Sequence, residues 1–119
     1  MTDRTELQEL EEAVKTFAAA RDWGKFHDPK NLAMALASET GELCAVLRWI
    51  ANDESDRAIG TEPIRSELLS EMGDVAVLLL LLCQRVGTHL DEVVLEKLAA
   101  NGLKYPVNES KGRAEKPTT

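Results

Sequence analysis

Residues 32–50 read LAMALASETGELCAVLRWI, and their apolar residues recur in alternating steps of four and three. This spacing predicts an amphipathic helix, because residues three and four apart share one helix face. Glu39 occupies one position of the apolar stripe. Residues 64–82, IRSELLSEMGDVAVLLLLL, repeat the pattern, and there Glu71 occupies the missing apolar position. The sequence therefore predicts two helices that each carry a carboxylate on the face expected to pack.

The rest of the chain predicts two further helices and no strand. The four predicted helices cover about residues 5–22, 29–51, 63–87 and 88–102. Capping residues are expected at Thr5, Asp28 and Thr88, and the polar residues 52–61 are expected to form a loop. The predicted fold class is all-α, most simply a four-helix bundle. Residues 1–107 are expected to form a single domain, followed by a polar, flexible tail at 108–119.

Composition narrows the possible partners. The 119 residues carry a net charge of −7, which argues against binding to nucleic acid or to an anionic membrane. The charged N-terminus does not resemble a signal peptide, and the nine-residue apolar run 75–83 is too short to span a membrane. Cys44 and Cys83 lie in apolar runs without a CxxC motif, so we expect reduced core cysteines in a cytoplasmic protein.

The helix over residues 63–87 is apolar on every side from Val75 to Cys83. A helix of this kind must be covered all round. Three neighbouring helices in so small a bundle can hardly cover it. We therefore expect a homo-oligomer with this helix at the interface.

Two pairs of carboxylates predict a metal site. Glu39 and Glu42, like Glu71 and Asp74, are three residues apart, so each pair projects from one side of its helix. If the two helices pack antiparallel, all four carboxylates converge and repel each other, and a hard divalent cation would offset that repulsion. Because no Glu-x-x-His motif is present, Mg²⁺ or Mn²⁺ is favoured over iron or zinc. The alternative is that these pairs lie on solvated helix faces.

A glycine lies inside each pair, at Gly41 and Gly73. Glycine costs a helix roughly 0.5–1 kcal/mol relative to alanine. Close backbone approach, room for a ligand or another packing requirement would each explain it.

Two other groups of residues are candidates for ligand binding. The first group is spaced i, i+4, i+7 and i+8 and shares a helix face, which suits phosphate and hydrogen-bonding contacts. It consists of Lys97, Asn101, Lys104 and Tyr105. Aromatic residues near the start and end of the 29–51 helix suit stacking against a nucleobase. The aromatic group consists of Trp23, Phe26, His27 and Trp49. The alternatives are an ordinary solvated helix end for the first group and core filling for the second.

These motifs together resemble the MazG-like superfamily of all-α nucleoside triphosphate pyrophosphohydrolases. Glu39-Thr-Gly-Glu42 and Glu71-Met-Gly-Asp74 match the Glu-x-x-Glu and Glu-x-x-Asp pattern of that superfamily. The dCTP pyrophosphatase-like branch is indicated by FHDP at residues 26–29, by the run at 31–43, by Trp49, and by the Lys97, Asn101, Tyr105-Pro106 ending. Ser70 differs from relatives that carry a second glutamate before Glu71.

The resemblance implies Mg²⁺-dependent cleavage of a nucleoside triphosphate, expected to be dCTP or a modified dCTP, to the monophosphate and pyrophosphate. It implies that Glu39, Glu42, Glu71 and Asp74 are the metal-binding and catalytic residues. The expected substrate-binding residues are Trp23, His27, Trp49, Lys97, Asn101 and Tyr105. It also implies a tetramer, a dimer of dimers, in which neighbouring subunits complete each site, and a role in sanitising the nucleotide pool. The alternatives are a dUTP or phosphoribosyl-nucleotide pyrophosphohydrolase and a non-catalytic helical oligomerisation module.

Overall fold

The structure, a computed structural model, describes residues 3–115, and most of these residues lie in helices. No strand occurs among these residues, so the predicted all-α class is confirmed. The helices are α1 (Glu6–Ala20), α2 (Pro29–Leu47), α3 (Ser55–Ala58), α4 (Ile64–Val86), α5 (Leu90–Lys104) and α6 (Val107–Ser110), with short 3-10 turns η1 (Gly24–Phe26) and η2 (Asn52–Glu54). The chain divides into two compact units after Gly87.

The helix boundaries follow capping chemistry that the sequence shows directly. Thr5 and Gln8 form the expected capping box at α1, with hydrogen bonds of 2.9 and 3.2 Å. The Asp28 carboxylate accepts a 2.9 Å hydrogen bond from the backbone N–H of Asn31 at the start of α2. At α5, the expectation of a Thr88 cap is wrong, because His89 is the N-cap.

Two predicted boundaries differ from the observed ones. Helix α2 ends at Leu47 rather than near residue 51, and the predicted loop at 52–61 contains η2 and α3. Helix α5 continues past Gly102 to Lys104. Helix α4 ends as expected at Gly87, whose φ of 88° is the left-handed conformation that glycine adopts at little cost.

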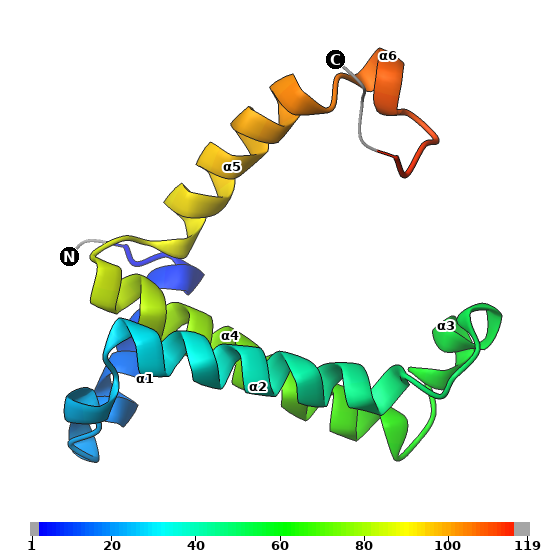
Figure 1. Cartoon of the computed structure of the whole chain (residues 1–119). Coiled ribbons are helices and arrows are strands. Elements are labelled where there is room, and N and C mark those ends of the chain that lie inside the picture. The colour runs from blue at the N-terminus through cyan, green and yellow to red at the C-terminus, as the bar shows by residue number, and fades with distance from the viewer. Residues whose placement is uncertain (1–2, 116–119) are drawn as a thin grey trace. The chain divides into compact units, whose positions relative to one another are not determined.

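The centre of the first unit is the antiparallel pair α2 and α4, which lie side by side (Figure 1). Their predicted apolar stripes do pack: Leu32 is 1% exposed, and the other apolar stripe positions of both helices are partly buried. Helix α1 also contacts α4, where the Gln84 side chain donates a 2.8 Å hydrogen bond to the backbone oxygen of Glu11. The predicted stripe geometry is therefore confirmed.

The core of this unit is small, and much apolar surface stays open. Ala18, Leu32, Leu80 and Cys83 are the buried apolar residues of the part described. Met34, Leu69 and Met72 are about half exposed or more, and Met34 reaches 64%. Cys44 is exposed, so the prediction that it is a core residue is wrong, whereas Cys83 is buried as expected.

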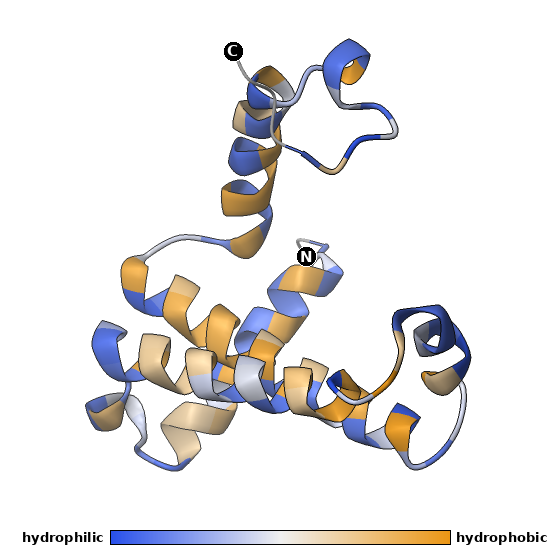
Figure 2. Cartoon of the chain, turned by 45° about the vertical axis from the view of Figure 1, so that its right-hand side comes forward, coloured by the Kyte–Doolittle hydropathy of each residue, from blue (hydrophilic) through white to orange (hydrophobic). Residues whose placement is uncertain are grey.

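The second unit contains α5 and α6. Helix α5 has no buried residue, and its hydrophobic residues colour parts of its ribbon orange in Figure 2. Leu95, Leu98 and Leu103 are more than half exposed. The first residues of the segment predicted as a flexible tail, 108–110, belong to helix α6. Residues 116–119 of that segment lie outside the described part. None of the helices in residues 3–115 is long and apolar enough to cross a membrane.

Candidate metal centre and adjoining cavity

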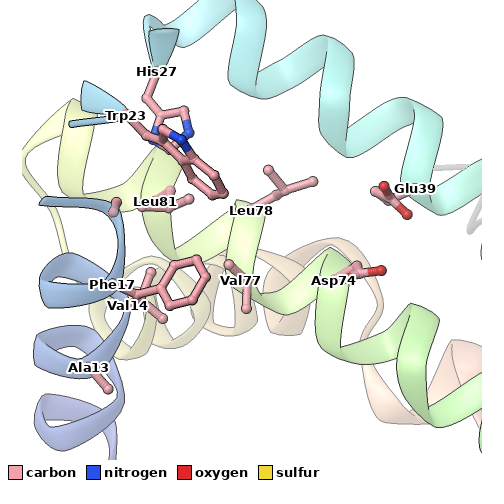
Figure 3. Close-up of a pocket in the computed structure, with 11 residues that line it drawn as sticks. Ala13, Val14, Phe17, Trp23, His27, Glu39, Asp74, Val77, Leu78 and Leu81 are labelled. Carbon is pink, nitrogen blue, oxygen red and sulfur yellow. The ribbon is translucent and has the colours of Figure 1, made fainter. Parts of the chain in front are cut away.

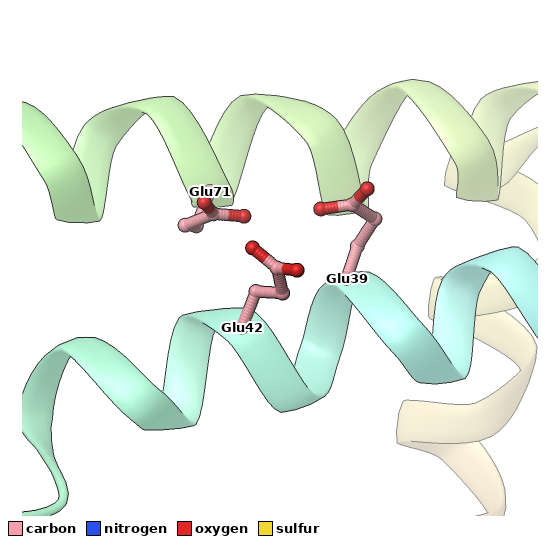
Figure 4. Close-up of side chains that lie close together, drawn as sticks. All are labelled: Glu39, Glu42 and Glu71. Atoms are coloured by element: carbon pink, nitrogen blue, oxygen red, sulfur yellow. The ribbon is translucent and has the colours of Figure 1, made fainter.

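Three carboxylates from two helices converge between α2 and α4. Glu39 and Glu42 come from α2 and Glu71 comes from α4, and one oxygen of each lies within 4.8 Å of the other two (Figure 4). The antiparallel pairing explains the convergence, because it places the middle of one helix against the middle of the other. Asp74, the fourth predicted ligand, is outside this group and lines the neighbouring cavity with Glu39.

The four predicted metal ligands differ in how far their side chains are buried. Glu39 and Glu71, which interrupt the apolar stripes, are partly buried, whereas Glu42 and Asp74 are exposed. Oε2 of Glu71 is buried and has no hydrogen-bond partner. No Lys or Arg forms an ion pair with any of the four carboxylates within residues 3–115. The group therefore offers oxygen ligands without a protein cation to neutralise them.

The electrostatics of the group show in the pKa of Glu71. Removal from water raises this pKa above its ordinary value of 4.5. A side-chain hydrogen bond with Glu39 and the negative charges of Glu42, Glu39 and Asp74 raise it further. A divalent cation bound by these oxygens would act in the opposite direction, because it favours the ionised carboxylate.

The two glycines inside the pairs face open space. A Cβ built on Gly41 or on Gly73 meets no atom within 4 Å. Close backbone approach within the chain is therefore excluded as the reason for either glycine. Room for a ligand, or for packing against another copy, remains.

A cavity of about 540 Å³ adjoins the carboxylates (Figure 3). Glu39 and Asp74 lie at one end of it, and Trp23 and His27 lie at the other. The wall between them is apolar and comes from α1 and α4. It consists of Ala13, Val14, Phe17, Ala18, Val77, Leu78 and Leu81. This arrangement suits a flat apolar group of a ligand whose anionic part reaches the carboxylates through a cation.

The turn after α1 brings Trp23 to the cavity. The backbone N–H groups of Asp22 and Trp23 donate to the carbonyls of Ala19 and Ala18, both at 3.1 Å, and Asp22 has a left-handed φ of 53°. This is the Schellman arrangement, in which the residue after the left-handed position packs back on the last helical turn. Trp23 does so against Phe17, with ring centroids 5.7 Å apart in an edge-on arrangement.

The known proteins that resemble this chain in sequence or in structure are named as pyrophosphatases. The chain is 36% identical over 112 residues to dCTP pyrophosphatase 1 of Mus musculus and of Bos taurus, and 33% identical to that of Homo sapiens. These matches cover 94% of the chain but 66% of each relative, so the chain spans about two thirds of their length. No protein-family model matches the chain.

A solved structure extends the comparison over nearly a whole chain. A pyrophosphatase from Archaeoglobus fulgidus superposes with a TM-score of 0.81 at 31% identity, covering 89% of this chain and 97% of the other. The chain belongs to the MazG-like nucleoside triphosphate pyrophosphohydrolases. The resemblance to the dCTP pyrophosphatase-like branch, drawn from the sequence motifs, is confirmed.

In this MazG-like chain, one predicted aromatic residue lies apart from the others. Trp23 and His27 precede α2, whereas Trp49 follows it, and the 19-residue helix is about 28 Å long. Trp49 is also 86% exposed. A single aromatic slot that joins Trp49 to Trp23 and His27 therefore does not form within one chain, because a rigid helix separates them.

The predicted phosphate-binding face lies in the second unit of the MazG-like chain. Lys97 and Asn101 are on α5, and Tyr105 is its C-cap, where its backbone N–H donates a 2.7 Å hydrogen bond to the Asn101 carbonyl. Their spacing predicts one shared side of the helix end, although the φ of −121° and ψ of 72° at Tyr105 are not helical. Their role toward a substrate stays a prediction.

Sequence patterns missed several residues of the cavity wall. In the sequence, Val14 and Phe17 are apolar residues of the helix predicted at 5–22, and Val77 and Leu81 belong to the apolar run 75–83. They line the cavity with Trp23 and His27 in the structure. Helical periodicity identifies such residues as apolar but does not distinguish those that border a cavity from those that fill a core.

Proposed function

We propose that this chain hydrolyses a nucleoside triphosphate, dCTP or a modified dCTP, to the monophosphate and pyrophosphate. The clustered carboxylates of α2 and α4 would form its metal centre. Three converging carboxylates at the mouth of an apolar and aromatic cavity carry the proposal. Membership of a pyrophosphohydrolase family supports it, and the relatives named dCTP pyrophosphatase 1 support the choice of base.

The donor set fits a hard divalent cation. Glu39, Glu42 and Glu71 present carboxylate oxygens within 4.8 Å of one another, and one Glu71 oxygen lacks any hydrogen-bond partner. Such oxygens suit Mg²⁺, with Mn²⁺ as the alternative. Asp74 would join as the fourth ligand from the next turn of α4. The bound cation would neutralise the triphosphate and lower the pKa of a water molecule.

The protein groups have distinct tasks in this proposal. The four carboxylates hold the cation, and one of them accepts the proton of the attacking water. Trp23 and His27 hold the base at the far end of the cavity, by stacking and by an edge hydrogen bond. The apolar wall between them excludes bulk water from the base.

A homo-oligomer, expected as a dimer of dimers, would complete the site. The small core and the exposed apolar side chains of α2, α4 and α5 support association. Trp49, exposed and distant from Trp23 in its own chain, would then serve the site of a neighbouring copy, and Lys97, Asn101 and Tyr105 would meet the phosphates. The proposed compartment is the cytoplasm, where the nucleotide pool lies and the two free cysteines stay reduced.

A panel of triphosphates tests the proposal directly. Pyrophosphate release from dCTP, 5-methyl-dCTP, dUTP, dTTP and dATP is measured with Mg²⁺, with Mn²⁺ and with EDTA. The proposal expects metal-dependent release, fastest with a deoxycytidine triphosphate. Preference for dUTP would favour the dUTP alternative, and the same assay with a phosphoribosyl-nucleotide tests the other. Absence of release from every nucleotide would leave a non-catalytic helical module, and light scattering of the same sample gives the oligomeric state.

A further inference from the structure

Arg21, at the C-cap of α1, contacts the aromatic wall from outside the cavity. Its guanidinium carbon lies 3.6 Å from the centroid of the Phe17 ring and 6.0 Å from that of Trp23. Its Nη1 also donates a 3.0 Å hydrogen bond to the backbone oxygen of Phe17. One side chain is thus fixed to both the ring and the backbone of the same residue.

The contacts continue from Phe17 to the far end of the cavity. The rings of Phe17 and Trp23 meet edge-on with centroids 5.7 Å apart, and those of Trp23 and His27 do so at 6.2 Å. Phe17, Trp23 and His27 all line the cavity, whereas Arg21 does not. Phe17 is 49% exposed and Trp23 is 41% exposed. Half-exposed rings are not fixed by dense packing on all sides, so the cation over the first ring of the series helps to set its orientation.

We infer that Arg21 is a positioning residue that holds Phe17, and through it Trp23, in the orientation that receives the base; the inference rests on the proposed nucleotide site. A guanidinium is suited to this role, because its plane stacks on a ring while its N–H groups donate to a carbonyl. Arg21 would act on substrate binding without touching substrate.

Arg21 also affects the stability of α1, and the test must separate this effect from the positioning of the cavity wall. A positive charge at the C-terminus of a helix stabilises the helix through its dipole. A variant that only weakened α1 would lower the thermal stability without changing the wall. Thr5→Ala supplies the matched control, because it removes the capping box at the other end of the same helix.

The kinetic test compares Arg21→Met, Arg21→Gln and Arg21→Lys with Thr5→Ala in the full chain. Arg21→Met keeps much of the apolar stem but loses the charge and the donors, Arg21→Gln keeps a donor, and Arg21→Lys keeps the charge. KM for the preferred triphosphate should rise roughly two- to five-fold in Arg21→Met, the range expected for loss of an exposed cation–π contact. The kcat should stay close to that of the wild type. Arg21→Lys should recover only part of the affinity, because the ammonium keeps the charge but not the stacking plane, and Thr5→Ala should leave KM unchanged.

A spectroscopic test observes the wall without any substrate. The chain is labelled with 5-fluorotryptophan, and the ¹⁹F resonances of Trp23 and Trp49 are assigned with Trp49→Phe. Arg21→Met should shift or broaden the Trp23 resonance. The inference is overturned if the Trp23 resonance is the same in Arg21→Met and in the wild type, or if KM is unchanged although that resonance moves.

The two proposals fail in different ways. If the wild type hydrolyses no triphosphate, the proposed function fails, and with it the part of the inference that concerns substrate. If the wild type is active but Arg21→Met shows an unchanged KM, only the role of Arg21 is wrong.

Discussion

Glu39 of α2 and Glu71 of α4 present carboxylate oxygens within 4.8 Å of each other, although both residues are acidic. Two carboxylates this close repel each other when both are ionised, so the site without metal favours protonation of Glu71, whose pKa is raised. Each residue occupies the one position where the apolar stripe of its helix is interrupted. Helix packing favours an apolar residue at both positions, whereas metal binding requires a carboxylate. The two requirements therefore oppose each other at these two residues.

Replacing Glu71 by Gln should abolish most metal-dependent hydrolysis while keeping or raising stability. The amide is a poor ligand for a hard cation but removes a repulsive charge from the group. We expect pyrophosphate release to fall on the order of 100-fold or more, since loss of a direct ligand should exceed the effect of losing an outer-shell partner. Glu67→Gln, one turn earlier and exposed, is the matched control and should retain activity. Undiminished hydrolysis in Glu71→Gln would contradict the proposed metal centre.

The stability of the metal-free protein should depend on pH through Glu71. Because the pKa of Glu71 is raised in the folded chain, the folded state binds more protons than the unfolded state above about pH 4.5. The free energy of unfolding therefore falls as the pH rises from there through the folded pKa. Thermal melts in EDTA should show this fall in the wild type and a smaller one in Glu71→Gln. Saturating Mg²⁺ should reverse it, since the ion favours the ionised carboxylate; equal slopes with and without Mg²⁺ would argue against metal binding here.

Asp22 should tolerate glycine better than alanine. Its φ of 53° is left-handed, which costs a residue with a Cβ roughly 1–2 kcal/mol, although Asp is better accommodated there than most. We expect Asp22→Ala to lower the free energy of unfolding by about 1 kcal/mol and Asp22→Gly to change it by less. Urea denaturation measures both. The exposed Asp22–Lys25 ion pair, 3.2 Å long, is lost in both variants, so it cancels from the comparison. A larger loss for glycine than for alanine would show that backbone strain does not govern this turn.

Gly41→Ala and Gly73→Ala should each stabilise the helix that carries them. A Cβ at either position meets no atom of the chain within 4 Å, so only the helical preference for alanine remains, about 0.5–1 kcal/mol. Thermal or urea unfolding of the metal-free protein measures the change. Destabilisation would mean that a second copy of the chain fills the space beside that glycine, which light scattering of the same variant then tests.

Much of the fold was predictable because its causes are local. The capping residues Thr5 and Asp28 start α1 and α2 where the sequence indicates, and Gly87 ends α4. The stripe spacing predicted which faces pack, since residues three and four apart must share a face. The Thr88 cap was wrong because the helical hydrogen bonds begin one residue later, where the backbone N–H of Val93 donates to the His89 carbonyl.

The sequence by itself determined the helices, the carboxylate pairs and the family, because periodicity, capping and motif spacing are properties of neighbouring residues. Only the tertiary structure decided what those pairs meet. The antiparallel pairing of α2 with α4 brings Glu71 to Glu39 and Glu42, leaves Asp74 at the cavity, and sets Trp49 a helix length away from Trp23. It also places apolar residues of α1, such as Phe17, in the wall of the cavity. Such relationships depend on which helices pack together and in which register, and the side chains along one helix do not specify that alone.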